Sequence, residues 1–147
     1  LFNHDSPLRP ERFVTKKVVA SACRIATGSE EKLHLGNISI QRDWGWAPEY
    51  VQAMWTIMQQ TDPEDYVIAT GQSHSLEEIV AAAFSCCDLN WRYHVVIDQE
   101  LMGSSDLKTG MADISKAQEK LGWKAKYVMK DVVKMMVEEE MKIIKQR

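Results

Sequence analysis

The chain has 147 residues, of which 45% are hydrophobic, and a formal net charge of −3. This length and composition suffice for one hydrophobic core, so we expect a single domain over residues 1–147 rather than a disordered or fibrous chain. Lysine and arginine are scattered along the sequence, which argues against a nucleic-acid-binding surface. The longest apolar run, at 79–84, is far shorter than the roughly 20 residues that a membrane span needs.

Strand and helix patterns alternate along the chain, which favours an α/β fold over a helical bundle. Apolar residues at helical spacing mark the helices, Gly28 and Gly122 stand where a helix stops, and Ser75 with Glu78 forms a capping-box pattern. In chain order we expect the end of a strand at 1–3, a helix over 13–27, strands over 32–35 and around 38–40, a helix from 48 to about 60, a strand over 66–69, a helix from 75 through 87, a strand over 94–97, a loop over 101–111, and helices over 113–121 and 129–144.

Cys23, Cys86 and Cys87 are an odd number of cysteines without C-x-x-C spacing. Small buried thiols in a reduced, cytoplasmic protein are therefore expected. No histidine has a partner at metal-ligand spacing, so no metal site is predicted. The sequence has no Gly-x-Gly-x-x-Gly turn for a dinucleotide, and none of its 4 tyrosines is followed four residues later by a lysine. No catalytic residue is predicted.

A polar cluster of Asn3, His4 and Arg9 follows the first predicted strand. Open α/β sheets bind ligands beyond the carboxyl ends of their strands, so a phosphate or ribose contact fits this position. The alternative is that the polar residues of a proline-containing loop hydrogen-bond their own backbone.

Lys17 and Arg42 are cations suited to a diphosphate, Arg through a bidentate fork and Lys as a point charge. A lysine at a helix start is more commonly a solvated surface charge. Arg42 lies in Q-R-D-W-G beside Asp43 and is expected to be oriented. The neighbouring aromatic residues, among them Trp44 and Tyr50, are predicted to pack rather than to stack on a base.

Four stretches carry a resemblance to a known family: N-H-D-S-P with F-V-T-K-K within 3–17, G-N-I-S-I-Q-R-D-W-G-W-A-P-E-Y at 36–50, A-T-G-Q-S-H-S at 69–75 and S-K-A-Q-E-K-L-G-W at 115–123. Together they resemble the GDP-mannose 4,6-dehydratase family of the extended short-chain dehydrogenase superfamily. The resemblance implies the carboxyl-terminal, substrate-binding part of a Rossmann-type α/β enzyme, without its amino-terminal cofactor domain.

The resemblance also implies a set of binding residues. It places His4 and Arg9 on the NADP cofactor, Asn3 on the sugar nucleotide, Lys17 and Arg42 on the diphosphate, the backbone of Leu35 and Gly36 against the base, and Asp106 on a ribose hydroxyl. The chain departs from the family at Gly103, where the family has an arginine that closes over the nucleotide.

The whole enzyme implied by the resemblance is a lyase that converts GDP-mannose to GDP-4-keto-6-deoxymannose with NADP. This chain alone is expected to be inactive, to bind GDP or GDP-mannose, and to form a homo-oligomer, because a fragment exposes apolar surface and an open sheet edge. Two alternatives are a non-catalytic nucleotide-sugar or protein-binding module and a fragment of a related nucleotide-sugar epimerase; the motif order disfavours the epimerase.

Overall fold

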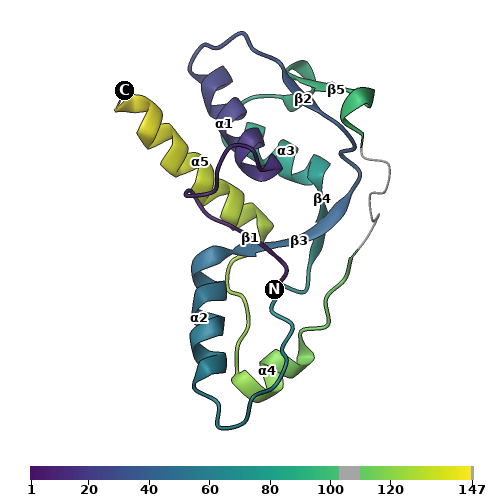
Figure 1. Cartoon of the computed structure of the whole chain (residues 1–147). Helices are drawn as coiled ribbons and strands as arrows, with labels where there is room; N and C mark the ends of the chain where they lie inside the picture. The colour runs from purple at the N-terminus through teal and green to yellow at the C-terminus, as the bar shows by residue number, and fades with distance from the viewer. Residues whose placement is uncertain (103–109, 147) are drawn as a thin grey trace.

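The structure, a computed structural model, describes residues 1–102 and 110–146. Strands and helices alternate along the chain (Figure 1), which confirms the predicted α/β class. The strands are β1 (Asn3–Asp5), β2 (Leu33–Leu35), β3 (Gln41–Trp46), β4 (Ser73–Ser75) and β5 (Val95–Ile97). The α-helices are α1 (Val14–Ala26), α2 (Ala47–Met58), α3 (Leu76–Ser85), α4 (Ser115–Leu121) and α5 (Met129–Lys145), with 3-10 turns at Trp91–Tyr93 and Gln99–Leu101.

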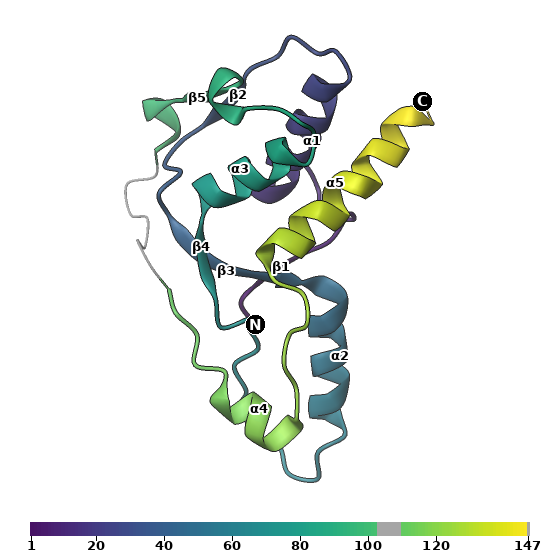
Figure 2. The same cartoon turned by 180° about the vertical axis from the view of Figure 1, so that it is seen from behind.

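Strand β3 is the centre of a three-stranded sheet of order β1-β3-β4. It pairs in parallel with β1, where Asn3 lies opposite Trp44, and antiparallel with β4, where Arg42 lies opposite His74. Strands β2 and β5 form a separate parallel pair. Figures 1 and 2 show the three-stranded sheet between two groups of helices, α1, α3 and α5 on one side and α2 and α4 on the other.

Each helix group has its own hydrophobic core. The larger core joins α1, α3 and α5, and its fully buried side chains include Val18, Val19, Val80 and Phe84. The smaller core surrounds Tyr50 and contains Ala53, Ile68, Ala117 and Trp123. The β1–β3 pair therefore rests on packed side chains in both directions, which fixes the backbone of the residues that build the site described below.

The predicted helices are confirmed to within a few residues at their ends. The Ser75 hydroxyl accepts the Glu78 N–H (3.1 Å), and the Glu78 carboxylate accepts the Ser75 N–H (2.7 Å), so the capping box at the start of α3 is present. Helix α3 ends at Ser85, before the predicted residue 87. Gly122 adopts the left-handed conformation (φ 61°) that ends α4.

The strand predictions are right for β2 and β5 and wrong at two places. Residues 38 and 39 form a turn, in which Asn37 Oδ1 accepts the Ser39 N–H (2.9 Å), and the strand begins only at Gln41. Residues 66–69 form no strand among the described residues, although Phe2 N–H donates to the Ile68 carbonyl (3.0 Å). In both segments the apolar side chains serve core packing, which produces the same sequence pattern as a strand.

The remaining differences have simple physical causes. The first strand lies at Asn3–Asp5, two residues beyond the predicted strand end, and β4 was not predicted because Ser-His-Ser lacks an apolar signal. Cys23 is buried as expected, but Cys86 is exposed and Cys87 is only half-buried. Most of the predicted 101–111 loop lies outside the described residues. Within 1–102 and 110–146, no helix is long and apolar enough to cross a bilayer.

Candidate functional site

The β1–β3 pair presents two different faces, because successive side chains of a strand point in opposite directions. On one face, Asn3 and Asp5 of β1 and Arg42 and Trp44 of β3 line a cavity of about 230 Å³. On the other face lies His4, between these two positions of β1. Two alternate residues of the R-D-W-G stretch, Arg42 and Trp44, thus line the cavity.

The cavity brings two guanidinium groups together. Arg9, from the loop after β1, and Arg42, from β3, both line it, together with residues of the first turn of α1. Asp5 is the carboxylate among the described lining residues. Two guanidinium groups that line one cavity offer several N–H donors, an arrangement that suits a phosphate or diphosphate.

Arg9 is held at the cavity wall by several contacts. Its Nε lies 3.0 Å from Asp5 Oδ1 as an ion pair, although without the alignment of a hydrogen bond, and its guanidinium carbon lies 4.0 Å from the centre of the Phe13 ring. Asp5 is only 2% exposed. Burial raises the pKa of the Asp5 carboxyl, while a hydrogen bond from Thr15 and the charges of Arg9 and His4 act in the opposite direction.

Asp43 fixes the backbone on which Arg42 stands. It is 1% exposed, and its two carboxylate oxygens accept the N–H groups of Thr70 (3.0 Å) and Gly71 (2.7 Å). Arg42 itself donates from its guanidinium to the Gln41 carbonyl (2.7 Å). Asp43 therefore ties the A-T-G segment to β3 on the face opposite the cavity, and its contribution to Arg42 is indirect.

The predicted base-binding residues lie at the end of β2. The Leu35 carbonyl accepts the Asp98 N–H (2.7 Å), and Gly36 follows where the backbone of Leu101 passes so closely that an added Cβ would collide with the Leu101 carbonyl. Lys17 of α1 donates from Nζ to the His34 carbonyl (2.8 Å). Lys17, predicted to bind the diphosphate with Arg42, thus lies beside β2 and is not among the described residues that line the cavity of Arg9 and Arg42, here called the arginine cavity.

His4 and Arg9, both predicted on one cofactor, are on different sides of β1. The His4 ring stacks on Tyr50, with centroids 4.8 Å apart and planes inclined by 24°, and His4 Nδ1 lies 2.8 Å from the Phe2 carbonyl oxygen. Arg9 shares its cavity with Asn3 and Arg42 instead. Asp106 and Gly103 lie outside the described residues.

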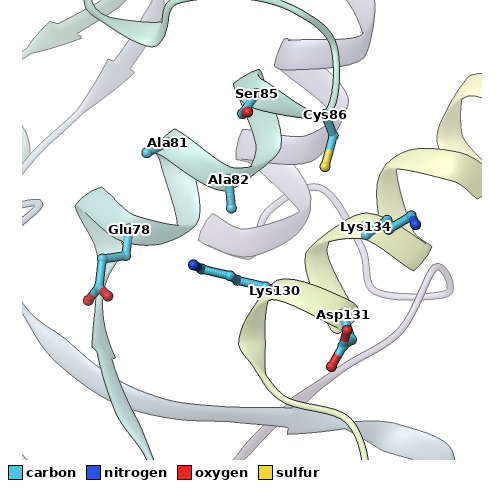
Figure 3. A pocket seen from close by; sticks show the side chains of 8 residues that line it. All are labelled: Glu78, Ala81, Ala82, Ser85, Cys86, Lys130, Asp131 and Lys134. Carbon is cyan, nitrogen blue, oxygen red and sulfur yellow. The ribbon is translucent and has the colours of Figure 1, made fainter.

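A larger groove of about 610 Å³ lies between α3 and α5 (Figure 3). Its lining residues are Glu78, Ala81, Ala82, Ser85, Cys86, Lys130, Asp131 and Lys134. Charges of both signs line this groove, and none of the residues predicted to bind a ligand is among them. Among the described residues there is also no cluster of histidine, cysteine, aspartate or glutamate suited to a metal ion.

Comparison with known proteins identifies the family. The family model for GDP-mannose 4,6 dehydratase matches residues 1–136. The chain belongs to this family. It is 46% identical over 145 residues to GDP-mannose 4,6 dehydratase 1 of Arabidopsis thaliana and 35% identical over 162 residues to the human GDP-mannose 4,6 dehydratase. These alignments cover 99% of this chain but 40% and 44% of the two relatives, so this dehydratase-family chain spans less than half of their length.

Solved structures show the same fold. RMD from Pseudomonas aeruginosa, complexed with NADPH, matches 96% of this dehydratase-family chain with a TM-score of 0.86 at 17% identity. The UDP-glucose 4-epimerase of Thermotoga maritima, solved with UDP-glucose, matches 97% with a TM-score of 0.79 at 22% identity. The chain covers 46% and 45% of these two proteins. At such low identity the likeness concerns the fold alone.

Proposed function

We propose that this chain is the carboxyl-terminal, substrate-binding part of a GDP-mannose 4,6-dehydratase, and that it holds the diphosphate of GDP-mannose in the arginine cavity. The observation that supports this most strongly is the meeting of Asn3, Arg9 and Arg42 around one space of about 230 Å³. Two of the three, Asn3 and Arg42, were assigned to the substrate from the family resemblance. The resemblance implies Arg9 for NADP instead; we propose that it binds the phosphates, because it lines the same cavity as Arg42.

The nucleoside end of the ligand extends toward β2. Arg42 belongs to β3, and Ile40, just before that strand, also lines the cavity. Residues 36–40 connect it to Leu35 and Gly36, and Lys17 lies beside this path at His34. In this arrangement the two arginines hold the phosphates, and the backbone at the end of β2 borders the base.

The residues of this chain suit a contact with one part of an NADP molecule, but not the binding of the whole cofactor. His4 lies on the second face of the β1–β3 pair, against the ring of Tyr50, whose buried hydroxyl has no hydrogen-bond partner among the described residues. The sequence has no glycine-rich turn for the dinucleotide phosphates. We propose that NADP, which supplies hydride transfer when bound, is held mainly by the part of the enzyme that this chain does not span.

Removal of Arg42 tests the phosphate site. We expect the chain to bind GDP in the high-micromolar range or more weakly, and Arg42→Ala to weaken this binding about 10–150-fold, because a hydrogen bond to a charged group contributes about 1.5–3 kcal/mol. Isothermal titration calorimetry measures the change. Arg92→Ala, which removes an exposed arginine beside Glu77, is the matched control and should leave binding unchanged. Equal affinities in all three proteins would contradict the proposal.

The chain alone is expected to be catalytically inactive. The Tyr/Lys pair of the superfamily is not among its residues, so even with NADP added as the hydride carrier this pair is not available to move the proton. Incubation with GDP-mannose and NADP, followed by chromatography of the nucleotide sugars, should show no 4-keto-6-deoxy product. Turnover that is present in the wild-type chain and lost in Arg42→Ala from a parallel purification would contradict this expectation.

A non-catalytic binding module and a fragment of a related epimerase are the other two candidates. A dehydratase part and an independent module bind GDP alike, but only a dehydratase part should restore turnover when mixed with the remainder of a dehydratase. An epimerase fragment should prefer a UDP-sugar to GDP-mannose. The match to the GDP-mannose 4,6 dehydratase model over residues 1–136 favours the dehydratase.

We propose that the isolated chain also binds a second copy of itself through α2. This helix lies at the outer edge of the molecule (Figures 1 and 2), and Val51, Trp55 and Met58 are 61%, 65% and 79% exposed on it. An exposed apolar face of this kind favours association. Light scattering over a concentration series should show a rising mass, which Trp55→Lys reduces and the control Gln52→Lys does not. A wild-type monomer at the highest concentration would refute self-association.

A further inference from the structure

The His4 ring is fixed by two contacts that do not involve a ligand. Its Nδ1 lies 2.8 Å from the carbonyl oxygen of Phe2, and its plane rests on the ring of Tyr50. A carbonyl oxygen only accepts hydrogen bonds, so His4 Nδ1 must carry the hydrogen. In the neutral ring this leaves Nε2 with a lone pair and makes it an acceptor.

Tyr50 is placed to hold that ring. It has no exposed surface, and it meets Trp123 edge-on with ring centroids 5.8 Å apart and planes at 86°. Its ring lies so close to β3 at Gly45 that an added Cβ at residue 45 would collide with it. In the strand register Gly45 is the partner of His4, so the glycine makes room for Tyr50 directly beside His4.

The Tyr50 hydroxyl makes no contact with the described residues that would favour a tyrosine at this position. Among the described residues it has no hydrogen-bond partner, and a buried hydroxyl without a partner is unfavourable. Burial, with the nearby charges of Asp43 and Glu49, raises the pKa of Tyr50, so the phenol stays neutral. The remaining role of the side chain is the contact that its ring makes.

We propose that Tyr50 is a positioning residue that, together with the Phe2 carbonyl, fixes His4 as the Nδ1–H tautomer and presents its Nε2 as a hydrogen-bond acceptor to a donor group of a nicotinamide dinucleotide. The cofactor role of His4 rests on the proposed function, whereas the fixed tautomer does not. A neutral Nε2 acceptor suits an amide N–H or a ribose O–H and is unsuited to a phosphate oxygen, which itself only accepts. His4 and the arginine cavity therefore recognise different chemistry on the two faces of β1.

The tautomer can be read in the full chain by long-range ¹H–¹⁵N correlation spectra in alkaline buffer, with His4→Gln used to assign the His4 signals. We expect wild type and Tyr50→Phe, which keeps the ring, to show Nδ1 protonated and Nε2 unprotonated. Tyr50→Leu, which removes the ring, should show a mixture of tautomers. The signals of His94, which stacks on Phe84 in the other core, report whether each variant is folded.

Two results would overturn the positioning role: an Nε2–H tautomer in the wild type, or the same pure Nδ1–H tautomer in a folded Tyr50→Leu. If Tyr50→Leu does not fold, Gly45→Ala provides the second variant, because its Cβ displaces the Tyr50 ring without removing it. An unchanged His4 spectrum in a folded Gly45→Ala would overturn the proposal in the same way.

Addition of NADP separates this inference from the proposed function. We expect NADP to shift His4 Nε2 more than Nδ1, and to bind roughly tenfold more weakly to Tyr50→Leu, the change of about 1.4 kcal/mol typical of one hydrogen bond. If NADP leaves His4 unshifted while GDP still binds at Arg42, the cofactor contact is wrong and the phosphate cavity stands. If GDP does not bind but the tautomer pattern holds, the proposed function fails and the positioning role remains.

Discussion

Replacement of Asp43 by alanine is expected to lower the free energy of unfolding by about 3–5 kcal/mol. Asp43 is 1% exposed and accepts the backbone N–H groups of Thr70 and Gly71 at 3.0 Å and 2.7 Å. Each donor left without an acceptor in the interior costs about 1–3 kcal/mol, and both bonds involve a charged acceptor. The A-T-G segment would then separate from β3, and the strand that carries Arg42 would lose its support.

Urea denaturation followed by tryptophan fluorescence measures this effect. Asp62→Ala removes an exposed carboxylate in a loop and is the matched control, which should change stability by less than about 0.5 kcal/mol. An Asp43→Ala protein as stable as the Asp62→Ala protein would show that the two backbone contacts do not support β3.

Replacement of Lys16 by methionine is expected to lower the free energy of unfolding by about 3 kcal/mol. Lys16 Nζ lies 2.5 Å from the Glu140 carboxylate and donates to the Pro7 carbonyl at 3.1 Å, so it joins α1, α5 and the loop after β1. The two side chains of the pair are only 11% and 14% exposed. Without Lys16, the Glu140 charge stays largely buried without compensation, which is the main cost.

A comparison of Lys16→Met with the double variant tests this explanation. Removal of the second charge in Lys16→Met with Glu140→Leu should restore a large part of the stability, because no buried charge remains. Lys134→Met, which breaks an exposed pair with Glu138, is the control and should cost under about 1 kcal/mol. A double variant less stable than Lys16→Met would contradict a penalty from the unpaired glutamate.

The helices could be predicted from the sequence because their signals are local. The spacing of apolar residues in α1 and α5, the Ser75 capping box and Gly122 are all read within a few residues. The small strands depend on distant partners instead. Strand β4 forms because Ser73 to Ser75 lie along β3, and 66–69 form no strand because they have no strand neighbour among the described residues.

Part of the site could also be predicted, because short motifs name some of its residues. The motifs name Asn3, Lys17 and Arg42 for one ligand; Asn3 and Arg42 line one cavity, whereas Lys17 lies beside β2. The separation of His4 from Arg9 depends on which residues form β1. Once that strand is placed at Asn3–Asp5 rather than at 1–3, alternation of side chains puts His4 on the opposite face from Asn3. The contribution of Tyr50 required the approach of α2 to Gly45, which no short motif shows.

The arginine cavity between β1, β3 and the start of α1 is tested most directly by mapping where GDP binds. On addition of GDP to the ¹⁵N-labelled chain, the amide signals of Asn3, Thr15 and Arg42 should shift because the diphosphate binds there. The amide signal of Gly36 should shift because the base lies against it. The amide signals of the α3–α5 groove should not change. The same titration of Arg42→Ala should show these shifts only at much higher GDP concentration. Shifts centred on Ala81, Ser85 and Lys130 in the α3–α5 groove, with none at β1 and β3, would contradict the account.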